Sequence, residues 1–160
     1  MEGHRQVSVD PAGEFDRAAD ALRTAIAGAC TQTQRWPGKV AASVQAALGF
    51  AARDPAAARR IALESLAQGG EVLQRRRRLF AAMALALAAG RLECPRARRL
   101  PANTESLLIG AIASLVGQRL LGGEDEALVD LAPQVIELTL LPYLGPEQAR
   151  AWAQRPEAWS

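Results

Sequence analysis

Apolar residues recur at spacings of three and four along most of this chain, and prolines and glycines divide it into segments of helix length. Phe15, Leu22 and Ile26, for example, lie on one stripe of a helix expected from Glu14 to Cys30. The 34 alanines and 21 leucines favour helices, and the seven aromatic residues leave little material for strands. We therefore predict an all-α fold, an antiparallel bundle of about six to seven helices.

Capping residues, prolines and glycines predict where the other helices begin and end. A second helix is expected to begin after Trp36 and Pro37 and to stop at Arg53. Asp54 and Pro55 start the next one at once, because Asp caps a helix and Pro is tolerated in its first turn. Residues 91–101 have two prolines and no period, which predicts an exposed loop. The remaining helices are expected at about 55–68, 71–89 (closed by Gly90), 104–121, 134–141 (ended by Pro142, Gly145 and Pro146) and 147–154.

Length and composition indicate one domain. A chain of 160 residues with 49% hydrophobic residues can bury a single core, and we expect a tail at 1–13, the domain at 14–154 and a second tail at 155–160. Two cysteines and a polar N-terminus predict a reducing, cytoplasmic location. The longest apolar run, Leu79–Ala89, has eleven residues, whereas crossing a bilayer takes about 20. We therefore predict no membrane segment.

Basic residues are concentrated in the middle of the chain. Residues 53–99 carry eleven arginines against four acidic residues, although the net charge of the whole chain is only +2. Direct binding of nucleic acid through these arginines would depend strongly on salt. Because no aromatic residues or reading motif accompany them, a solvated basic face is the preferred interpretation.

Catalytic and metal-binding residues are scarce in this sequence. The only histidine, His4, lies in the expected N-terminal tail, and general acid–base chemistry at neutral pH most often relies on histidine. Cys30 and Cys94 are far apart and lack a histidine at ligand spacing, which argues against a zinc site. We expect Cys30 in the core and Cys94 as an exposed thiol. The sequence predicts no enzyme, no metal and no cofactor.

The two helices expected at 104–121 and 134–141 are apolar on more than one side. The first has a face of large residues and a separate face of small ones, and small residues allow a second helix to approach closely. Because exposing such surfaces invites aggregation, we expect both helices to meet their copies in a homodimer. A helical hairpin buried inside a monomer is the alternative. The predicted interface residues are Gly110, Ala113, Ser114, Gly117, Leu121, Val135, Leu138 and Thr139.

Helices in the middle of the chain present large apolar side chains of the kind that line small-molecule pockets. The same side chains could fill a closed core, and the sequence leaves both interpretations open. Arg76 and Arg77 fall on this apolar stripe, where a guanidinium needs a partner such as Glu64, Glu71 or an anionic ligand, unless both extend to solvent. The predicted ligand-binding residues are Trp36, Phe50, Leu63, Leu66, Arg76, Arg77, Phe80, Met83 and Leu87.

Several stretches resemble the C-terminal part of TetR-type transcriptional regulators. They are Gly110–Leu121, Asp130–Leu138 and Leu141–Glu147, together with Ala51–Arg60 and the run Arg75–Arg78 that precedes an apolar helix. The order and lengths of the segments over residues 14–150 carry this similarity. The resemblance implies an all-helical domain that binds an effector and dimerises. In that family, the effector shifts the spacing of two N-terminal DNA-reading domains.

The family's helix-turn-helix domain has no counterpart here, since only 13 residues precede the first expected helix. We therefore expect this chain to bind DNA only if that domain is supplied elsewhere, and a fragment and a stand-alone domain remain equally open. The expected function is sensing of a small, mostly apolar effector, which can also carry a negative charge, by population shift. The alternative is a stand-alone helical module that binds a protein partner through the face that a DNA-binding domain would cover.

Overall fold

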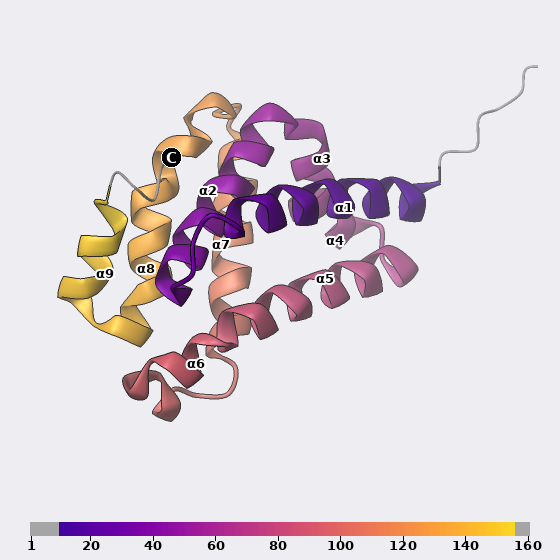
Figure 1. Ribbon diagram of the computed structural model, residues 1–160. Coiled ribbons are helices and arrows are strands. Elements are labelled where there is room, and N and C mark those ends of the chain that lie inside the picture. The colour runs from indigo at the N-terminus through magenta and orange to yellow at the C-terminus, as the bar shows by residue number, and fades with distance from the viewer. Residues whose placement is uncertain (1–9, 156–160) are drawn as a thin grey trace, which may run out of the picture.

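The computed structural model describes residues 10–155, and all regular structure in this range is helical (Figure 1). The predicted all-α fold is confirmed. The α-helices are α1 (Pro11–Cys30), α2 (Trp36–Arg53), α3 (Pro55–Arg59), α4 (Ser65–Ala67), α5 (Gly70–Ala88), α6 (Gly90–Glu93), α7 (Thr104–Leu121), α8 (Ala132–Leu144) and α9 (Pro146–Ala153). A π-helical turn, η1 (Arg60–Glu64), joins α3 to α4, and the 3₁₀ turns η2 (Pro95–Arg99) and η3 (Glu126–Leu131) precede α7 and α8.

Local sequence signals explain where several helices start and stop. Proline occupies one of the first two positions of α1, α2, α3, α8 and α9, where its missing N–H costs no hydrogen bond. The Asp54 carboxylate accepts a hydrogen bond from the backbone N–H of Ala57 at 3.0 Å, as expected of an N-cap. The predicted ends at Cys30, Arg53 and Leu121 agree with the structure.

The segment at 91–101 differs from its prediction. Instead of an exposed loop, it forms most of α6 and all of η2, and Cys94 and Ala97 are buried. Gly90 does not close a helix but begins α6, with its backbone against the Trp36 ring, where any Cβ atom would clash. The periodicity of apolar residues did not predict α6 and η2, because elements of four or five residues are too short to show a period.

Two helix ends also lie beyond their predicted positions. Helix α1 begins at Pro11, so residues 11–13 belong to it rather than to a tail. Helix α8 continues through Pro142 to Leu144 and stops at Gly145, whose φ of 81° suits glycine. Of the residues predicted to end this helix, Pro142 lies inside it and Gly145 is the one at which it stops.

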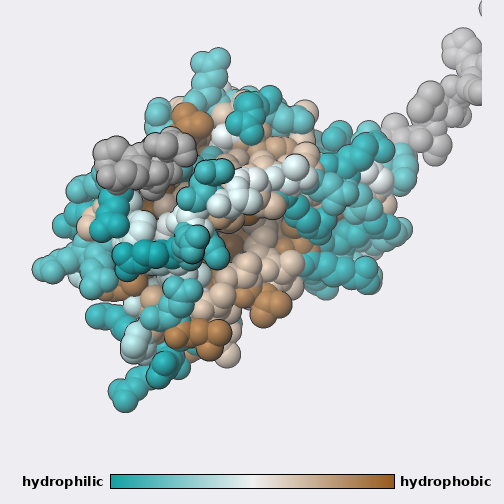
Figure 2. Space-filling view, in the orientation of Figure 1, coloured by the Kyte–Doolittle hydropathy of each residue, from teal (hydrophilic) through white to brown (hydrophobic). Residues whose placement is uncertain are grey.

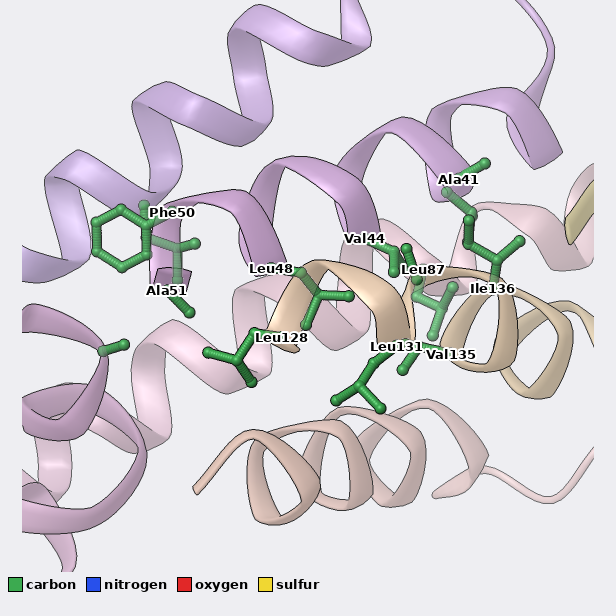
Figure 3. Close-up of a cluster of buried hydrophobic side chains, with 14 of the residues drawn as sticks. Ala41, Val44, Leu48, Phe50, Ala51, Leu87, Leu128, Leu131, Val135 and Ile136 are labelled. Carbon is green, nitrogen blue, oxygen red and sulfur yellow. The ribbon is translucent and has the colours of Figure 1, made fainter. Parts of the chain in front are cut away.

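A closely packed part of the core lies where α2 crosses η3 and α8 (Figure 3). Ala41 and Leu48 of α2 face Ile136 and Leu128, and all four side chains are almost completely buried. Helix α9 then packs against α8. Interdigitated side chains of this kind fix the relative positions of these elements.

Helices α1 and α5 cross the view of Figure 1 and run in the same direction, so the bundle is not antiparallel throughout. Near their N-termini, Asp16 and Arg75 form an ion pair that joins the two helices, and Arg75 also binds Glu71. Helix α7 packs against α5 and η1 from the other side. These helices frame the site described below.

One stretch meets a length and composition test for membrane spanning that the sequence analysis did not consider. Residues Glu126–Leu144, which cover η3 and α8, have a mean hydropathy of 1.3 over 18 residues, and 44% of that window is buried within the fold. Val135, Ile136 and Leu140 of this stretch are core residues. Core helices commonly pass such a test, so it is weak evidence for a membrane helix.

Candidate functional site

A cavity of about 410 Å³ lies between α1, α2, α5 and α7. Figure 2 shows apolar residues in a hollow between α1 and α5, on the face where these two helices separate. The volume is in the range of small-molecule sites, which are about 300–1,000 Å³ and mostly apolar. The structure therefore contains an open space where the sequence left a choice between a pocket and a filled core.

Four helices each turn one apolar stripe toward this cavity. Residues at spacings of three and four share a helix face, which explains why they line the same wall. Helix α1 contributes Leu22 and Ile26, α2 contributes Val40, Val44, Ala47, Leu48 and Ala51, α5 contributes Phe80, Met83, Ala86 and Leu87, and α7 contributes Ile109, Ile112, Ala113 and Val116.

Small side chains help to keep the space open. Ala47, Ala51 and Ala113 point at it from α2 and α7, and Ala58 and Ala62 from the segment between them. An alanine fixes the helix backbone without filling the volume that a leucine would occupy. The cavity is therefore a consequence of alanines at inward positions as well as of the helix arrangement.

Five residues of the lining carry polar side chains, and three of them, Cys30, Lys39 and Ser43, adjoin one another. The Cys30 Sγ atom lies 3.1 Å from the Ser43 hydroxyl and 3.7 Å from the Lys39 carbonyl oxygen. Lys39 and Glu93 also belong to the lining and are solvent-exposed at the rim. Among residues 10–155, neither Lys39 nor Glu93 takes part in an ion pair. The remaining polar residue, Thr139, donates its hydroxyl hydrogen to the Val135 carbonyl at 2.6 Å.

Five of the nine predicted ligand-binding residues line the cavity. They are Trp36, Phe50, Phe80, Met83 and Leu87. Leu63 lies instead beside Gly117 of α7, and Leu66 is 55% exposed to solvent. Leu63 and Leu66 share an apolar composition with the lining residues, but neither side chain borders the cavity.

The two arginines predicted to reach the cavity do not line it. Arg76 donates from Nε to the Ile61 carbonyl at 3.3 Å, and its guanidinium carbon lies 4.1 Å from the centre of the Phe80 ring. Partial burial lowers the pKa of Arg76. Arg77 is exposed to solvent. The carboxylates considered as partners are engaged elsewhere, Glu64 by Arg60 and Glu71 by Arg75.

A buried polar network stands behind one wall of the cavity, and the sequence analysis did not find it. Glu105 is only 4% exposed and accepts hydrogen bonds from Arg91 Nε at 2.7 Å, Arg91 Nη2 at 2.8 Å and the Tyr143 hydroxyl at 2.6 Å. The Tyr143 ring packs against Trp36, with ring centres 4.6 Å apart. The cavity wall at Trp36 is thus connected to the start of α7 and the end of α8.

This network has clear electrostatic effects. The Arg91 hydrogen bonds lower the pKa of Glu105 to about 2, despite the burial that opposes ionisation. Burial, and then the adjacent carboxylate, raise the pKa of Tyr143, so that it stays a neutral donor. Local sequence gave no signal, because an acidic residue in the first turn of a helix ordinarily complements the helix dipole.

The eight predicted interface residues are not on one surface. Gly110, Ser114, Leu121 and Leu138 are exposed. The other four face inward: Ala113 and Thr139 line the cavity, Gly117 packs against Leu63, and Val135 is buried in the core. The small-residue face of α7 therefore divides into an internal half and an external half.

The described residues offer few side chains for a metal site or a reactive thiol. No group of three or more His, Cys, Asp or Glu side chains in this range could hold a metal ion, and His4 lies outside it. Cys94, expected to be exposed, is buried, and burial raises the pKa of its thiol. Cys30, expected in the core, is half-buried at the cavity.

Comparisons with known proteins were made for the whole chain. No family model matches it, and searches of curated proteins and of solved structures found no significant match.

Proposed function

We propose that this chain is a ligand-binding domain that senses a small, mostly apolar effector and acts as a homodimer, in the manner of the C-terminal part of TetR-type regulators. The observation that carries the proposal is the cavity of about 410 Å³ among α1, α2, α5 and α7. Natural interiors rarely keep a void of this size unless something occupies it. DNA binding would require a helix-turn-helix domain supplied elsewhere.

The way in which the cavity is bounded supports a role in sensing. Helices α1 and α5 are joined by the Asp16–Arg75 ion pair at one end and border the cavity further along. Helix α7 has one face on the cavity, while Gly110, Ser114 and Leu121 on its other side are exposed. A ligand that fits one spacing of these helices better would shift the population toward that spacing.

Exposed leucines on the last long helices support the homodimer. Leu107 and Leu121 of α7 are 65% and 74% exposed, and Leu138 of α8 is 52% exposed. Apolar side chains of this size at the surface of one subunit mark contact surfaces when they occur together. An added Cβ atom at Gly110 would meet no other atom within 4 Å, so a second helix could approach there.

The outward face of α1 argues against the alternative function, a module that binds a protein partner through the first helix. That face carries Arg17, Asp20, Arg23 and Thr24, all exposed to solvent, rather than an apolar patch. Together with an open cavity, this favours the ligand-sensing proposal.

Ligand binding is tested with the neutral apolar fluorophore N-phenyl-1-naphthylamine. We expect saturable binding that Ala113→Leu weakens by at least about tenfold, because the larger side chain enters the cavity from α7. The matched control is Ala21→Leu, which adds the same atoms on the exposed outward face of α1 and leaves affinity unchanged. Non-saturable binding, or equal effects of both variants, would refute the cavity as the site.

Dimerisation is tested by analytical ultracentrifugation at micromolar concentration. We expect a 34 kDa species, twice the 17.0 kDa of the chain, and its dissociation by Gly110→Arg. Gly28→Arg is the control, since Gly28 is an exposed glycine of α1 that also has open space around it. A 17.0 kDa species for the unmodified chain would overturn the dimer.

A further inference from the structure

From the distribution of polar groups in the cavity, we infer that its ligand is an amphiphile with one aliphatic chain and a single carboxylate, which Lys39 and Ser43 bind while the chain lies among the apolar walls. This inference rests on the proposed ligand-binding function and names the chemical class of the ligand.

The lining has one polar part and a long apolar remainder. Cys30 contacts both Ser43 and the backbone of Lys39, so these three residues adjoin one another at the end of α1 and the first turns of α2. The rest of the lining consists of Leu, Ile, Val, Phe, Met and Ala side chains, apart from Trp36, Glu93 and a Thr139 hydroxyl that is already bonded. Such a cavity is matched by a molecule that is polar at one end only.

Hydrogen-bond donors predominate in the polar part. Lys39 is the only lysine of the sequence and offers three N–H donors, and no acidic residue within 10–155 pairs with it. Ser43 lies one helical turn further along α2, and its hydroxyl contacts only the Cys30 thiol among the described hydrogen bonds. A carboxylate has two oxygens and can accept from both residues, and bonds to an ionised acceptor are the stronger kind.

The position of these donors on α2 adds to the preference for an anion. Lys39 belongs to the first turn of α2, which begins at Trp36 and runs for 18 residues. The positive end of the helix dipole therefore lies beside the ammonium group. A cationic head group would be repelled by both.

Glu93 limits the charge that the rim can accept. It offers only acceptors and is exposed on the rim formed by α6. With Lys39 and Glu93 both in the lining, a carboxylate ligand would bring the total for the lining to one positive and two negative charges, whereas a phosphate dianion would add a further negative charge. The rim thus favours a monoanion over a dianion.

The predicted arginine partners are not available for this role. Arg76 is bonded to the Ile61 carbonyl and stacked on Phe80, and Arg77 is exposed away from the lining. We therefore keep the anionic effector that the sequence predicted. Lys39 of α2, rather than Arg76 and Arg77 of α5, provides the positive charge that binds it.

The test compares three ligands of equal chain length, decanoate, 1-decanol and decylamine, by isothermal titration calorimetry on the full chain below their micelle concentrations. We expect decanoate to bind about tenfold more tightly than decanol, and decylamine to bind most weakly. Added salt lowers the decanoate affinity and leaves that of decanol nearly unchanged.

Variants locate the head group. Lys39→Met keeps the apolar stem of an exposed side chain, and we expect it to remove the preference for decanoate while decanol binding is retained. Arg77→Met is the matched control and leaves both affinities unchanged, because Arg77 does not line the cavity. Circular dichroism verifies that both variants are folded.

The outcomes separate the two proposals. If decanol binds and Ala113→Leu abolishes its binding, the cavity is a ligand site. Equal or weaker binding of decanoate, or a preference that survives Lys39→Met, then overturns the carboxylate inference alone. If none of the three ligands nor the naphthylamine binds, the ligand-binding function itself fails.

Discussion

Helix α2 borders two regions built from the same kinds of residue, one closely packed and one hollow. On the packed side, Ala41 lies against Ile136 of α8 and is completely buried (Figure 3). On the hollow side, Ala47 points into the cavity together with Ala51. The difference comes from what stands opposite. Side chains of η3 and α8 fill the space beside α2, whereas α1, α5 and α7 surround a space that none of them fills.

This comparison shows that an apolar helix face does not by itself indicate a core. Both faces of α2 keep their side chains away from water, and a helical wheel describes them in the same way. Only the positions of the neighbouring helices separate a wall of a cavity from a layer of the core. Four experiments examine these regions and the network that joins them, beginning with the largest expected effect.

The same deletion made in each region should have unequal costs. Ile136→Ala removes a fully buried side chain from the packed region, and we expect the free energy of unfolding to fall by about 4 kcal/mol. Ile112→Ala removes a half-buried side chain that borders the cavity on one side. The expected fall in the free energy of unfolding is about 1–2 kcal/mol, because fewer contacts disappear. Urea denaturation measures both values. Equal losses would mean that the cavity is closed in solution.

The network of Arg91, Glu105 and Tyr143 joins the two regions, and Glu105→Gln should break it. We expect a loss of about 3 kcal/mol at pH 7, since a buried bidentate ion pair is left without its negative partner. The control, Glu124→Gln, removes an exposed ion pair with Arg119 and should cost less than about 1 kcal/mol.

The stabilising effect of Glu105 should also depend on pH. Its pKa is lowered from 4.5 to about 2 in the folded protein, so its contribution is fully present above about pH 4.5 and is lost as pH falls toward 2. The stability difference between the unmodified chain and Glu105→Gln should therefore shrink between pH 5 and pH 3. A constant difference over this range would contradict the role assigned to the carboxylate.

Replacing an alanine by leucine should change the free energy of unfolding in opposite directions in the two regions. Ala41→Leu overfills the packed side, and we expect a loss of about 1–3 kcal/mol. Ala113→Leu places the same atoms in the cavity, and we expect a gain of about 1 kcal/mol from the added apolar burial. Thermal unfolding of both variants gives the sign directly, and destabilisation by Ala113→Leu would show that no free volume exists there.

Much of the secondary structure could be predicted because its signals are local. The ends of helices at Cys30, Arg53 and Leu121 follow from periodicity and capping residues. The prediction at Gly90 was wrong because the sequence does not distinguish a glycine that ends a helix from a glycine that leaves room for a neighbouring aromatic ring. Only the position of the Trp36 ring in the fold shows that Gly90 leaves room for this ring.

The candidate site was predicted less completely than the helices. Trp36, Phe80 and Met83 line the cavity as expected, because their stripes face inward. Leu66 lies on the surface, although its composition and spacing gave the same signal. Lys39 was missed because a single lysine on a helix ordinarily extends into solvent, and no local pattern marks one that stands at the rim of a cavity.

The sequence by itself determined that this chain is helical, where most helices run and which of their faces avoid water, because those properties depend on hydrogen bonds and side chains a few residues apart. Tertiary structure alone decided that one face of α2 is packed and the other open, that Glu105 meets Arg91 and Tyr143, and that Lys39 stands at the cavity rim. Those outcomes depend on distances between segments far apart in the chain, which are fixed only when the helices pack against one another.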